Sequence, residues 1–257
     1  MTIAAHPDLS DLLADIHARL IRLLGENLVG IYVFGSVAWD GYDPGVSDAD
    51  LLVVTARQLV AADYARLQQM HAVLAGREQW KDRIEVAYLS RQALRTFKER
   101  TSEMGVISPG ESFHVVTAGK DWLMNWYDVR EHAIVVAGPD PKTLIDPITR
   151  SELKACIRDY VRLFPERVRD NLHQGSDAYA VLTMCRSLHT NIVGEMATKR
   201  VAAEWAASKY PEWSTLIAQA QEWRLAADNV ATNSAEVHAQ VEAFVDFTVA
   251  VWDASGL

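Results

Sequence analysis

The chain has 257 residues, a formal net charge of −9, and ordinary apolar (49%) and charged (23%) fractions. This length allows two modest domains, and the acidic balance disfavours a nucleic-acid-binding protein, whose surface is usually basic. No apolar run is long enough to span a bilayer and no secretory segment opens the chain, so we expect a cytoplasmic protein that binds no membrane. We also expect a monomer whose acidic charge suits a cationic small substrate.

The N-terminal half alternates segments with helical and strand-like patterns. Apolar residues at helical spacing predict helices at 9–24, 61–74, 91–100 and 121–132. Short runs of β-branched and aromatic residues between turn residues predict strands at 28–34, 51–54, 83–89 and 133–137. The polar, turn-rich stretch 101–119 is interpreted as a loop or irregular strand that borders the site.

The predicted helix 121–132 has an unusually aromatic face, with Trp122, Trp126 and Tyr127. Aromatic stripes usually bury, so we interpret this face as a core or interdomain packing surface. The alternative is a wall of a ligand site.

The stretch from Val29 to Val54 carries the strongest functional pattern. A predicted strand ends in Gly35-Ser36, a turn-rich connection follows, and Ser47-Asp48-Ala49-Asp50 leads directly into the next strand. Side chains alternate along a strand, so we expect Asp48 and Asp50 on the same face. Two neighbouring carboxylates repel each other unless a cation lies between them, and oxygen ligands suit Mg²⁺.

The residues around these carboxylates suit a phosphate group. Gly35 permits close backbone approach, and Ser36 is placed to open a helix whose first N–H groups would hold a phosphate. A third carboxylate, Glu85, lies within an apolar strand-like run, where an unpartnered charge would be costly. An Asp-x-Asp pair alone more often reflects a solvated strand edge, so the prediction depends on the whole ordered combination.

This combination resembles the nucleotidyltransferase superfamily of DNA polymerase β. The resemblance rests on Gly35-Ser36, Asp48-Ala49-Asp50 and Glu85, and it covers roughly the first third of the chain. It implies a polymerase-β-like domain in which a mixed sheet is combined with helices.

The second half is predicted to be entirely helical. The loop 138–141 (GPDP) is the strongest break in the chain, and helical periodicity dominates from residue 151 onward. We therefore expect an α+β nucleotidyltransferase domain at 1–147 and an all-α helical bundle at 148–257. The expected helices of the bundle are 152–164, 177–194, 201–209, 214–229 and 235–252. The two cysteines, Cys156 and Cys185, lie in apolar helical segments and are expected to be free thiols.

Four short segments of this second half stand out: 180–186 (AVLTMCR), 194–199 (GEMATK), 202–206 (AAEWA) and 210–211 (YP). They resemble the C-terminal domain of the aminoglycoside adenylyltransferases that modify streptomycin and spectinomycin. The resemblance implies an enzyme that uses Mg²⁺ and transfers AMP from ATP to a hydroxyl of the drug, releasing pyrophosphate. Its partners would then be ATP and a cationic small-molecule antibiotic.

The resemblance assigns a role to each predicted site residue. Asp48 and Asp50 would hold Mg²⁺ against the triphosphate, and Glu85 would take the proton of the attacking drug hydroxyl and contact the drug. The residues that would bind ATP are Gly35, Ser36, Ser47, Arg186, Lys199 and Trp223; Ser47 could instead order its loop. Without the resemblance, Arg186 is interpreted as an interdomain salt bridge, Lys199 as a helix-terminal charge and Trp223 as core.

The drug-binding residues are predicted less directly. Asp177 is the best positional match to an acidic drug-binding residue of the family, and its alternative is a plain helix N-cap. A tryptophan that family members use against streptomycin has no counterpart in 165–175, so we expect spectinomycin to be modified at least as well as streptomycin. For a second drug-facing tryptophan of the family, Phe113 and His114 lie nearest in sequence.

Two other readings remain open. The same catalytic half serves enzymes that adenylylate proteins or other metabolites, and the missing drug-site aromatics favour that alternative. A protein that kept the fold only to bind a nucleotide or a partner is the other possibility. The intact Asp48, Asp50 and Glu85 argue against it, because a site that no longer catalyses a reaction usually loses such costly carboxylates.

Overall fold

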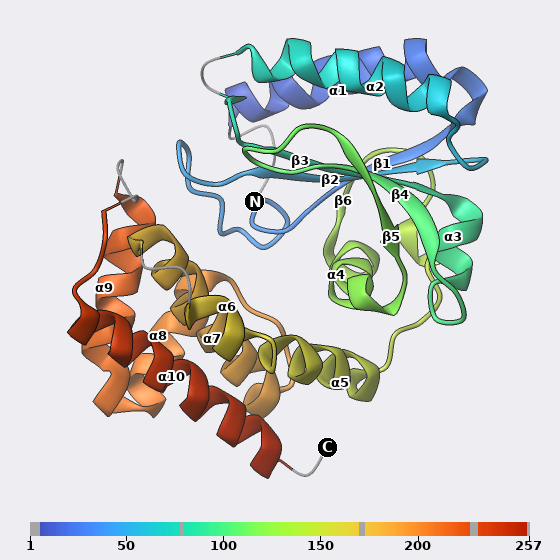
Figure 1. The fold of residues 1–257 in the computed structure, drawn as a ribbon. Coiled ribbons are helices and arrows are strands. Elements are labelled where there is room, and N and C mark those ends of the chain that lie inside the picture. Colours follow the sequence, from blue (N-terminus) through green and yellow to red (C-terminus); the bar gives the residue numbers. More distant parts are fainter. Residues whose placement is uncertain (1–5, 78–79, 170–172, 227–230, 256–257) are drawn as a thin grey trace. The chain divides into compact units, whose positions relative to one another are not determined.

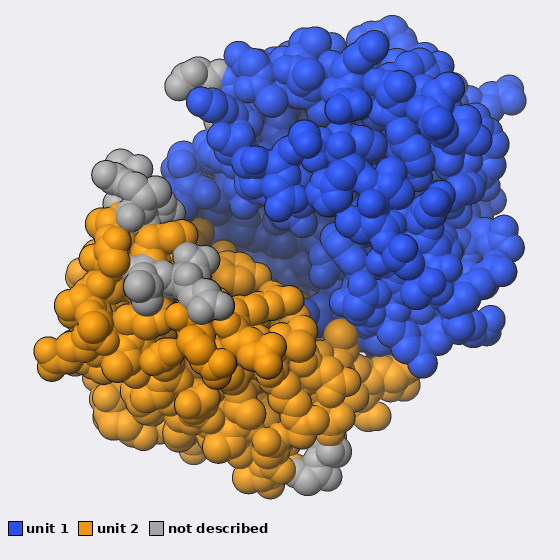
Figure 2. Space-filling model, viewed as in Figure 1, with its two compact units in different colours: residues 1–148 blue, residues 149–257 orange. Residues whose placement is uncertain are grey.

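The structure is a computed structural model that describes residues 6–77, 80–169, 173–226 and 231–255. The chain divides into two compact units, residues 1–148 and residues 149–257 (Figure 2). Unit 1 combines a sheet with helices, whereas the elements in the described part of unit 2 are helical apart from one isolated bridge between His173 and Thr232. This confirms the predicted fold class. None of the helices within the described ranges is long and apolar enough to cross a membrane.

Unit 1 is built on a six-stranded sheet with the strand order β5-β4-β3-β2-β1-β6 (Figure 1). The strands are β1 (Leu28–Phe34), β2 (Ala49–Thr55), β3 (Ile84–Ser90), β4 (Ser102–Ile107), β5 (His114–Ala118) and β6 (Ile134–Ala137). The strands β2 and β3 are parallel, and all other neighbours are antiparallel. Because parallel strands need a crossover, the chain between β2 and β3 runs through a helix.

One face of this sheet carries the helices α1 (Pro7–Leu24) and α2 (Ala61–Ala75) (Figure 1). Both helices bury an apolar stripe, and alternate strand residues such as Val33, Leu51 and Val86 join the same core. The apolar residues that recur every 3.6 positions in the helices and every second position in the strands therefore pack together in one buried layer.

The opposite face of the sheet carries α4 (Leu123–His132), with the short helix α3 (Arg91–Thr96) beside it (Figure 1). The Ser90 hydroxyl accepts a hydrogen bond from the Ala93 amide and caps α3. Trp126 of α4 is only 1% exposed. The aromatic face of α4 thus packs into the protein at this position.

The stretch 101–119 forms an antiparallel hairpin of β4 and β5 where a loop or irregular strand was expected. Its alternation is hard to recognise because Gly105 stands at one of the positions that face the core. A Cβ atom there would lie 2.8 Å from the rings of both Phe113 and Tyr64, so the missing side chain makes room for them. Met104 and Val106, on the other face, are buried.

The helices of unit 2 are α5 (Arg150–Val161), α6 (Phe164–Arg169), α7 (Gln174–Val193), α8 (Lys199–Lys209), α9 (Ser214–Leu225) and α10 (Ala235–Ala254). The helix α7 packs against α8, α9 and α10 and forms the centre of the unit. The expected helix 214–229 ends at Leu225 in the structure, and positions 227–229 lie outside the described residues. Cys156 and Cys185 are free thiols, which confirms the prediction.

Candidate active site

The structure brings two predicted carboxylates next to each other at the amino-terminal ends of parallel strands. Asp50 of β2 lies opposite Glu85 of β3 in the strand register. Their neighbours Leu51 and Val86 belong to the core under α1 and α2, so Asp50 and Glu85 point to the other face of the sheet.

The pKa of Glu85 is perturbed at this face. Burial raises the pKa of its carboxyl group, and the negative charges of Asp48 and Glu111 raise it further. A raised pKa is what a carboxylate needs to take up a proton near neutral pH. The same effect shows that Asp48 lies close enough to Glu85 to interact with it.

Glu111 was not among the predicted site residues. It lies between β4 and β5, its side chain is 61% exposed, and its Oε2 atom is 3.8 Å from Nε2 of His114. No sequence motif marks this residue, because only the pairing of β3 with β4 and β5 brings the hairpin beside Glu85.

Gly35 is required by its contact with Asp50. Its φ angle of +65° lies in the left-handed region, and a Cβ atom would lie 2.1 Å from Oδ2 of Asp50. Any side chain at position 35 would therefore strain the backbone and displace the carboxylate. This contact with Asp50 differs from the predicted role of Gly35, which is the approach of its backbone to a phosphate.

Residues 35–40 form consecutive turns, and the expectation that Ser36 opens a helix is wrong. The amides of Ala38 and Trp39 donate to the Gly35 carbonyl, but Asp40 has a φ of +58°, which a right-handed helix cannot accommodate. Among the described residues, no acceptor is recorded for the amides of Ser36 and Val37. Successive N–H groups in such a turn form a concavity that can bind an anion.

Ser47 orders the loop that leads to Asp48. It is 5% exposed, and its hydroxyl oxygen accepts a hydrogen bond of 3.0 Å from the Asp43 amide. The Arg83 guanidinium donates to the Ser47 carbonyl at 2.6 Å. Of the two roles expected for Ser47, these contacts favour the ordering of the loop.

A buried carboxylate on α4 holds the turn after β1. Asp128 is 5% exposed and accepts hydrogen bonds from the Gly35 amide at 3.0 Å and from the Trp39 indole N–H. Nδ1 of His132 lies 3.2 Å from the same carboxylate, and the centres of the Trp39 and His132 rings lie 3.9 Å apart with the rings tilted by 41°. The sequence analysis did not single out Asp128. The signal that could have found it is that Asp128 is an acidic residue on an otherwise apolar and aromatic face of its helix.

The donor set at this site suits Mg²⁺ better than a softer metal ion. Asp48 and Asp50 supply carboxylate oxygens, and Mg²⁺ commonly takes one or two carboxylates and completes its shell with water and phosphate. Within the described ranges, no group of three or more His, Cys, Asp or Glu side chains forms a metal site by itself. Asp48 and Asp50 would fit an ion whose remaining ligands are water and phosphate oxygens.

Of the three predicted ATP-binding residues that come from unit 2, two are Arg186 and Lys199. Arg186 of α7 donates to the Ala197 carbonyl at 3.0 Å, which ties α7 to the segment before α8. Lys199 is the first residue of α8, and its Nζ atom lies 5.8 Å from the centre of the Tyr179 ring. A cation at a helix N-terminus is disfavoured by the helix dipole, so the charge of Lys199 does not stabilise α8 through that dipole.

The other two predicted residues of unit 2 differ in exposure. Trp223 of α9 is half-buried. Asp177 is 0% exposed, and its two oxygens contact Asn233 at 2.6 Å and Nδ1 of His238 at 3.0 Å. These contacts join α7 to α10 and its preceding segment, so the geometry of Asp177 favours a structural role. The helix N-cap is His173, whose ring accepts the Ser176 amide.

Phe113 and His114 lie on opposite faces of the sheet. The Phe113 ring contacts Tyr64, His71 and Tyr88 on the side of α1 and α2, away from Glu85. His114 pairs with Val106, which in turn pairs with Ala87, so its side chain shares the face of Glu85.

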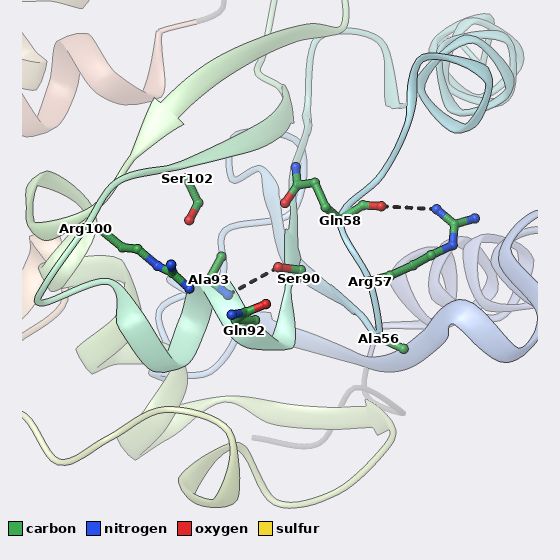
Figure 3. Close-up of a pocket in the computed structure, with 8 residues that line it drawn as sticks. All are labelled: Ala56, Arg57, Gln58, Ser90, Gln92, Ala93, Arg100 and Ser102. Carbon is green, nitrogen blue, oxygen red and sulfur yellow. Dashed lines mark hydrogen bonds between the residues drawn. The ribbon is translucent and has the colours of Figure 1, made fainter.

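A separate cavity of about 120 Å³ opens beyond the carboxyl ends of β2 and β3 (Figure 3). Its lining comes from residues 56–58, from Ser90, Gln92 and Ala93, and from Arg100 and Ser102. It therefore lies at the opposite end of these strands from Asp50 and Glu85, and it contains none of the predicted site residues.

Comparisons with known proteins find matches for parts of both units. Residues 16–101 match the nucleotidyltransferase domain, and residues 143–250 match the C-terminal domain of aminoglycoside adenylyltransferases. A spectinomycin 9-adenylyltransferase from Staphylococcus aureus is 25% identical over 74% of this chain and 75% of its own. An aminoglycoside (3'') (9) adenylyltransferase from Shigella flexneri is 24% identical over 96% of both chains.

A solved structure has the same fold. The spectinomycin adenyltransferase AAD(9) from Enterococcus faecialis, crystallised with ATP and spectinomycin, matches with a TM-score of 0.75 and 18% identity. The match covers 95% of this chain and 99% of that chain.

The sheet with its paired carboxylates and the matched domain define a nucleotidyltransferase. The helical unit that follows narrows this class, because it is the C-terminal domain found in one group of these enzymes. The chain thus combines the nucleotidyltransferase domain with the C-terminal domain of the aminoglycoside adenylyltransferases.

Proposed function

We propose that this enzyme uses Mg²⁺ to transfer AMP from ATP to a hydroxyl group of spectinomycin or a related cationic aminoglycoside. The observation that carries the proposal is the register of Asp50 beside Glu85, with Asp48 and the Gly35 turn next to them. Asp48 and Asp50 can share a cation, and Glu85 has a raised pKa. Together they supply the metal ligands and the proton acceptor that AMP transfer needs.

Asp48 and Asp50 would hold Mg²⁺, which when bound neutralises charge on the triphosphate. The Ser36 and Val37 amides would bind a phosphate oxygen, since they have no recorded acceptor among the described residues. Arg186 and Lys199 would add positive charge to the nucleotide, and Trp223 would pack on its base. These residues bind and orient ATP and take no part in proton transfer.

Glu85 would act as the general base. The hydroxyl oxygen of the acceptor attacks the α-phosphorus, the new O–P bond forms, and the bond to the bridging oxygen of the β-phosphate breaks. The hydroxyl proton passes to Glu85, and pyrophosphate leaves with the bonding electron pair. The raised pKa of Glu85 favours this proton uptake.

The acceptor is expected to be cationic because the described site carries several carboxylates and the chain has a net charge of −9. Glu85 and Glu111 are the carboxylates that share this environment. The prediction that Asp177 contacts the drug is not retained as the first choice, because its oxygens already contact Asn233 and His238. Spectinomycin is expected to be modified at least as well as streptomycin, since segment 165–175 has no tryptophan.

The test is incubation with labelled ATP, Mg²⁺ and a panel of aminoglycosides, followed by detection of labelled drug. Asp48→Asn and Asp50→Asn should each reduce transfer on the order of a hundredfold or more. Asp11→Asn, on the exposed side of α1, should not. Full turnover in either site variant would contradict the metal assignment. ATP binding without transfer to any drug would favour a protein or another metabolite as acceptor.

A further inference from the structure

The turn that follows β1 is held from a distant part of the chain. The Gly35 amide donates to Asp128 across 93 positions of sequence, and the Trp39 indole N–H donates to the other carboxylate oxygen. Both ends of the turn are thereby attached to one side chain on α4. The turn contains the Ser36 and Val37 amides and contacts Asp50 through Gly35.

A buried carboxylate at this position is costly unless it is needed. Asp128 is 5% exposed, so its charge must be balanced by hydrogen bonds within the protein. It receives two N–H donors and lies 3.2 Å from His132. An apolar residue could pack against a sheet at lower cost, which indicates that the carboxylate serves the geometry of the turn.

We infer that Asp128 is a positioning residue for nucleotide binding. By fixing Gly35 and Trp39 at once, it sets the direction of the Ser36 and Val37 amides and keeps Gly35 against the Asp50 carboxylate. This inference rests on the proposed function, because it assumes that the turn binds a phosphate of ATP.

A carboxylate is required because both donors must be satisfied. In Asp128→Asn the side chain keeps its shape but retains only one acceptor oxygen, and its NH₂ group faces the second N–H donor. One end of the turn is then released. A second change, Trp39→Phe, removes the indole donor, so the asparagine oxygen can again accept the Gly35 amide.

The experiment compares these variants by calorimetric binding of a non-hydrolysable ATP analogue with Mg²⁺ and by steady-state kinetics. Asp128→Asn should lower kcat/KM for ATP about tenfold to a hundredfold, since small misplacements of binding groups have effects of this size. The KM of the drug should remain within about twofold. The double variant with Trp39→Phe should recover part of the loss.

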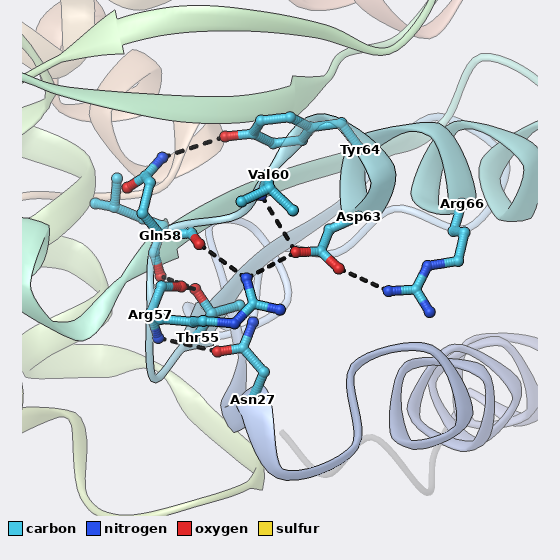
Figure 4. A network of polar contacts seen from close by, with 9 residues as sticks. Asn27, Thr55, Arg57, Gln58, Val60, Asp63, Tyr64 and Arg66 are labelled. Atoms are coloured by element: carbon cyan, nitrogen blue, oxygen red, sulfur yellow. Dashed lines mark hydrogen bonds and ion pairs between the residues drawn. The ribbon is translucent and has the colours of Figure 1, made fainter.

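The matched control is Asp63, another buried carboxylate of unit 1 (Figure 4). It is 3% exposed and accepts the Val60 amide at 3.2 Å, Arg57 at 2.9 Å and Arg66 at 2.6 Å. It lies in α2, after the carboxyl end of β2, and therefore away from the turn. Asp63→Asn should reduce stability without changing kcat/KM for ATP in the folded enzyme.

Hydrogen exchange supplies a readout that does not depend on ATP. The Gly35 amide should exchange faster in Asp128→Asn than in the wild type and at the wild-type rate in Asp63→Asn. Equal kcat/KM for ATP in Asp128→Asn and Asp63→Asn would overturn the inference. Wild-type protein that binds the ATP analogue but modifies no drug would overturn the proposed function instead, while the binding comparison would still decide the role of Asp128.

Discussion

The side chain of Glu85 combines burial with nearby negative charge, and both raise its pKa. Glu85→Gln keeps the shape of the side chain and removes the proton acceptor. We expect kcat to fall by about 10²–10⁴ while the affinity for ATP stays nearly unchanged. Pre-steady-state kinetics together with ATP titration measures the two effects separately. An equal loss of ATP binding would make Glu85 a metal ligand or a structural residue.

His71 makes the stability of unit 1 depend on pH. The side chain is 2% exposed, its Nε2 atom lies 2.7 Å from the Tyr88 hydroxyl, and burial lowers its pKa to about 4. The unfolded chain has a histidine pKa of about 6.5, so between these values only the unfolded state takes up the proton. The share of the free energy of unfolding that depends on His71 is therefore fully present above pH 6.5 and falls as the pH decreases below that value.

The expected loss in the free energy of unfolding is about 1.4 kcal/mol per pH unit, or about 2 kcal/mol between pH 7.5 and pH 5. Urea unfolding of the wild type and of His71→Phe at both pH values measures it, and the variant should lack this share of the dependence. The paired carboxylates Asp15, Asp63 and Glu131 have lowered pKa values and titrate below this window. The same pH dependence in both proteins would show that His71 does not cause it.

Among the elements, the β4–β5 hairpin has the most specific expected role. It brings Glu111 close enough to Glu85 to affect its pKa, and the exposed Glu111 carboxylate can meet a cationic acceptor. Glu111→Gln should raise the KM of a cationic drug about two- to fivefold, the range for an exposed and screened charge, with little effect on the KM of ATP.

The control for the hairpin is Glu103→Gln, an exposed carboxylate on β4 of the same hairpin. Comparing the drug KM of both variants at two salt concentrations separates a local contact from a general loss of negative charge. The same increase in both variants would assign the effect to net charge alone.

At the scale of the whole molecule, the two units are expected to contribute different parts of one reaction. Unit 1 contains Asp48, Asp50 and Glu85, and unit 2 contains Arg186 and Lys199. Lys199→Ala should raise the KM of ATP about tenfold or more, as the loss of a charge-assisted hydrogen bond does. Lys209→Ala, at the exposed end of the same helix, is the control. An unchanged KM in Lys199→Ala would remove Lys199 from the ATP site.

The sequence by itself determined the elements and the chemistry of the short motifs. Short runs of β-branched and aromatic residues, with turn residues at their ends, predict β1, β2, β3 and β6, because this pattern is a local property of the chain. Asp48, Asp50 and Glu85 stand out for the same reason, since charges beside apolar strands are costly wherever the strands lie. The β4–β5 hairpin was harder to predict because Gly105 interrupts its pattern.

Only the tertiary structure decided which residues meet. The parallel pairing of β2 with β3 places Asp50 beside Glu85, and the packing of α4 under the sheet brings Asp128 to Gly35. The burial of Asp177 is likewise a result of packing between helices, and no local pattern distinguishes it from an exposed helix N-cap. These contacts join positions far apart in the chain, and their energies depend on distance and burial, which a linear pattern does not contain.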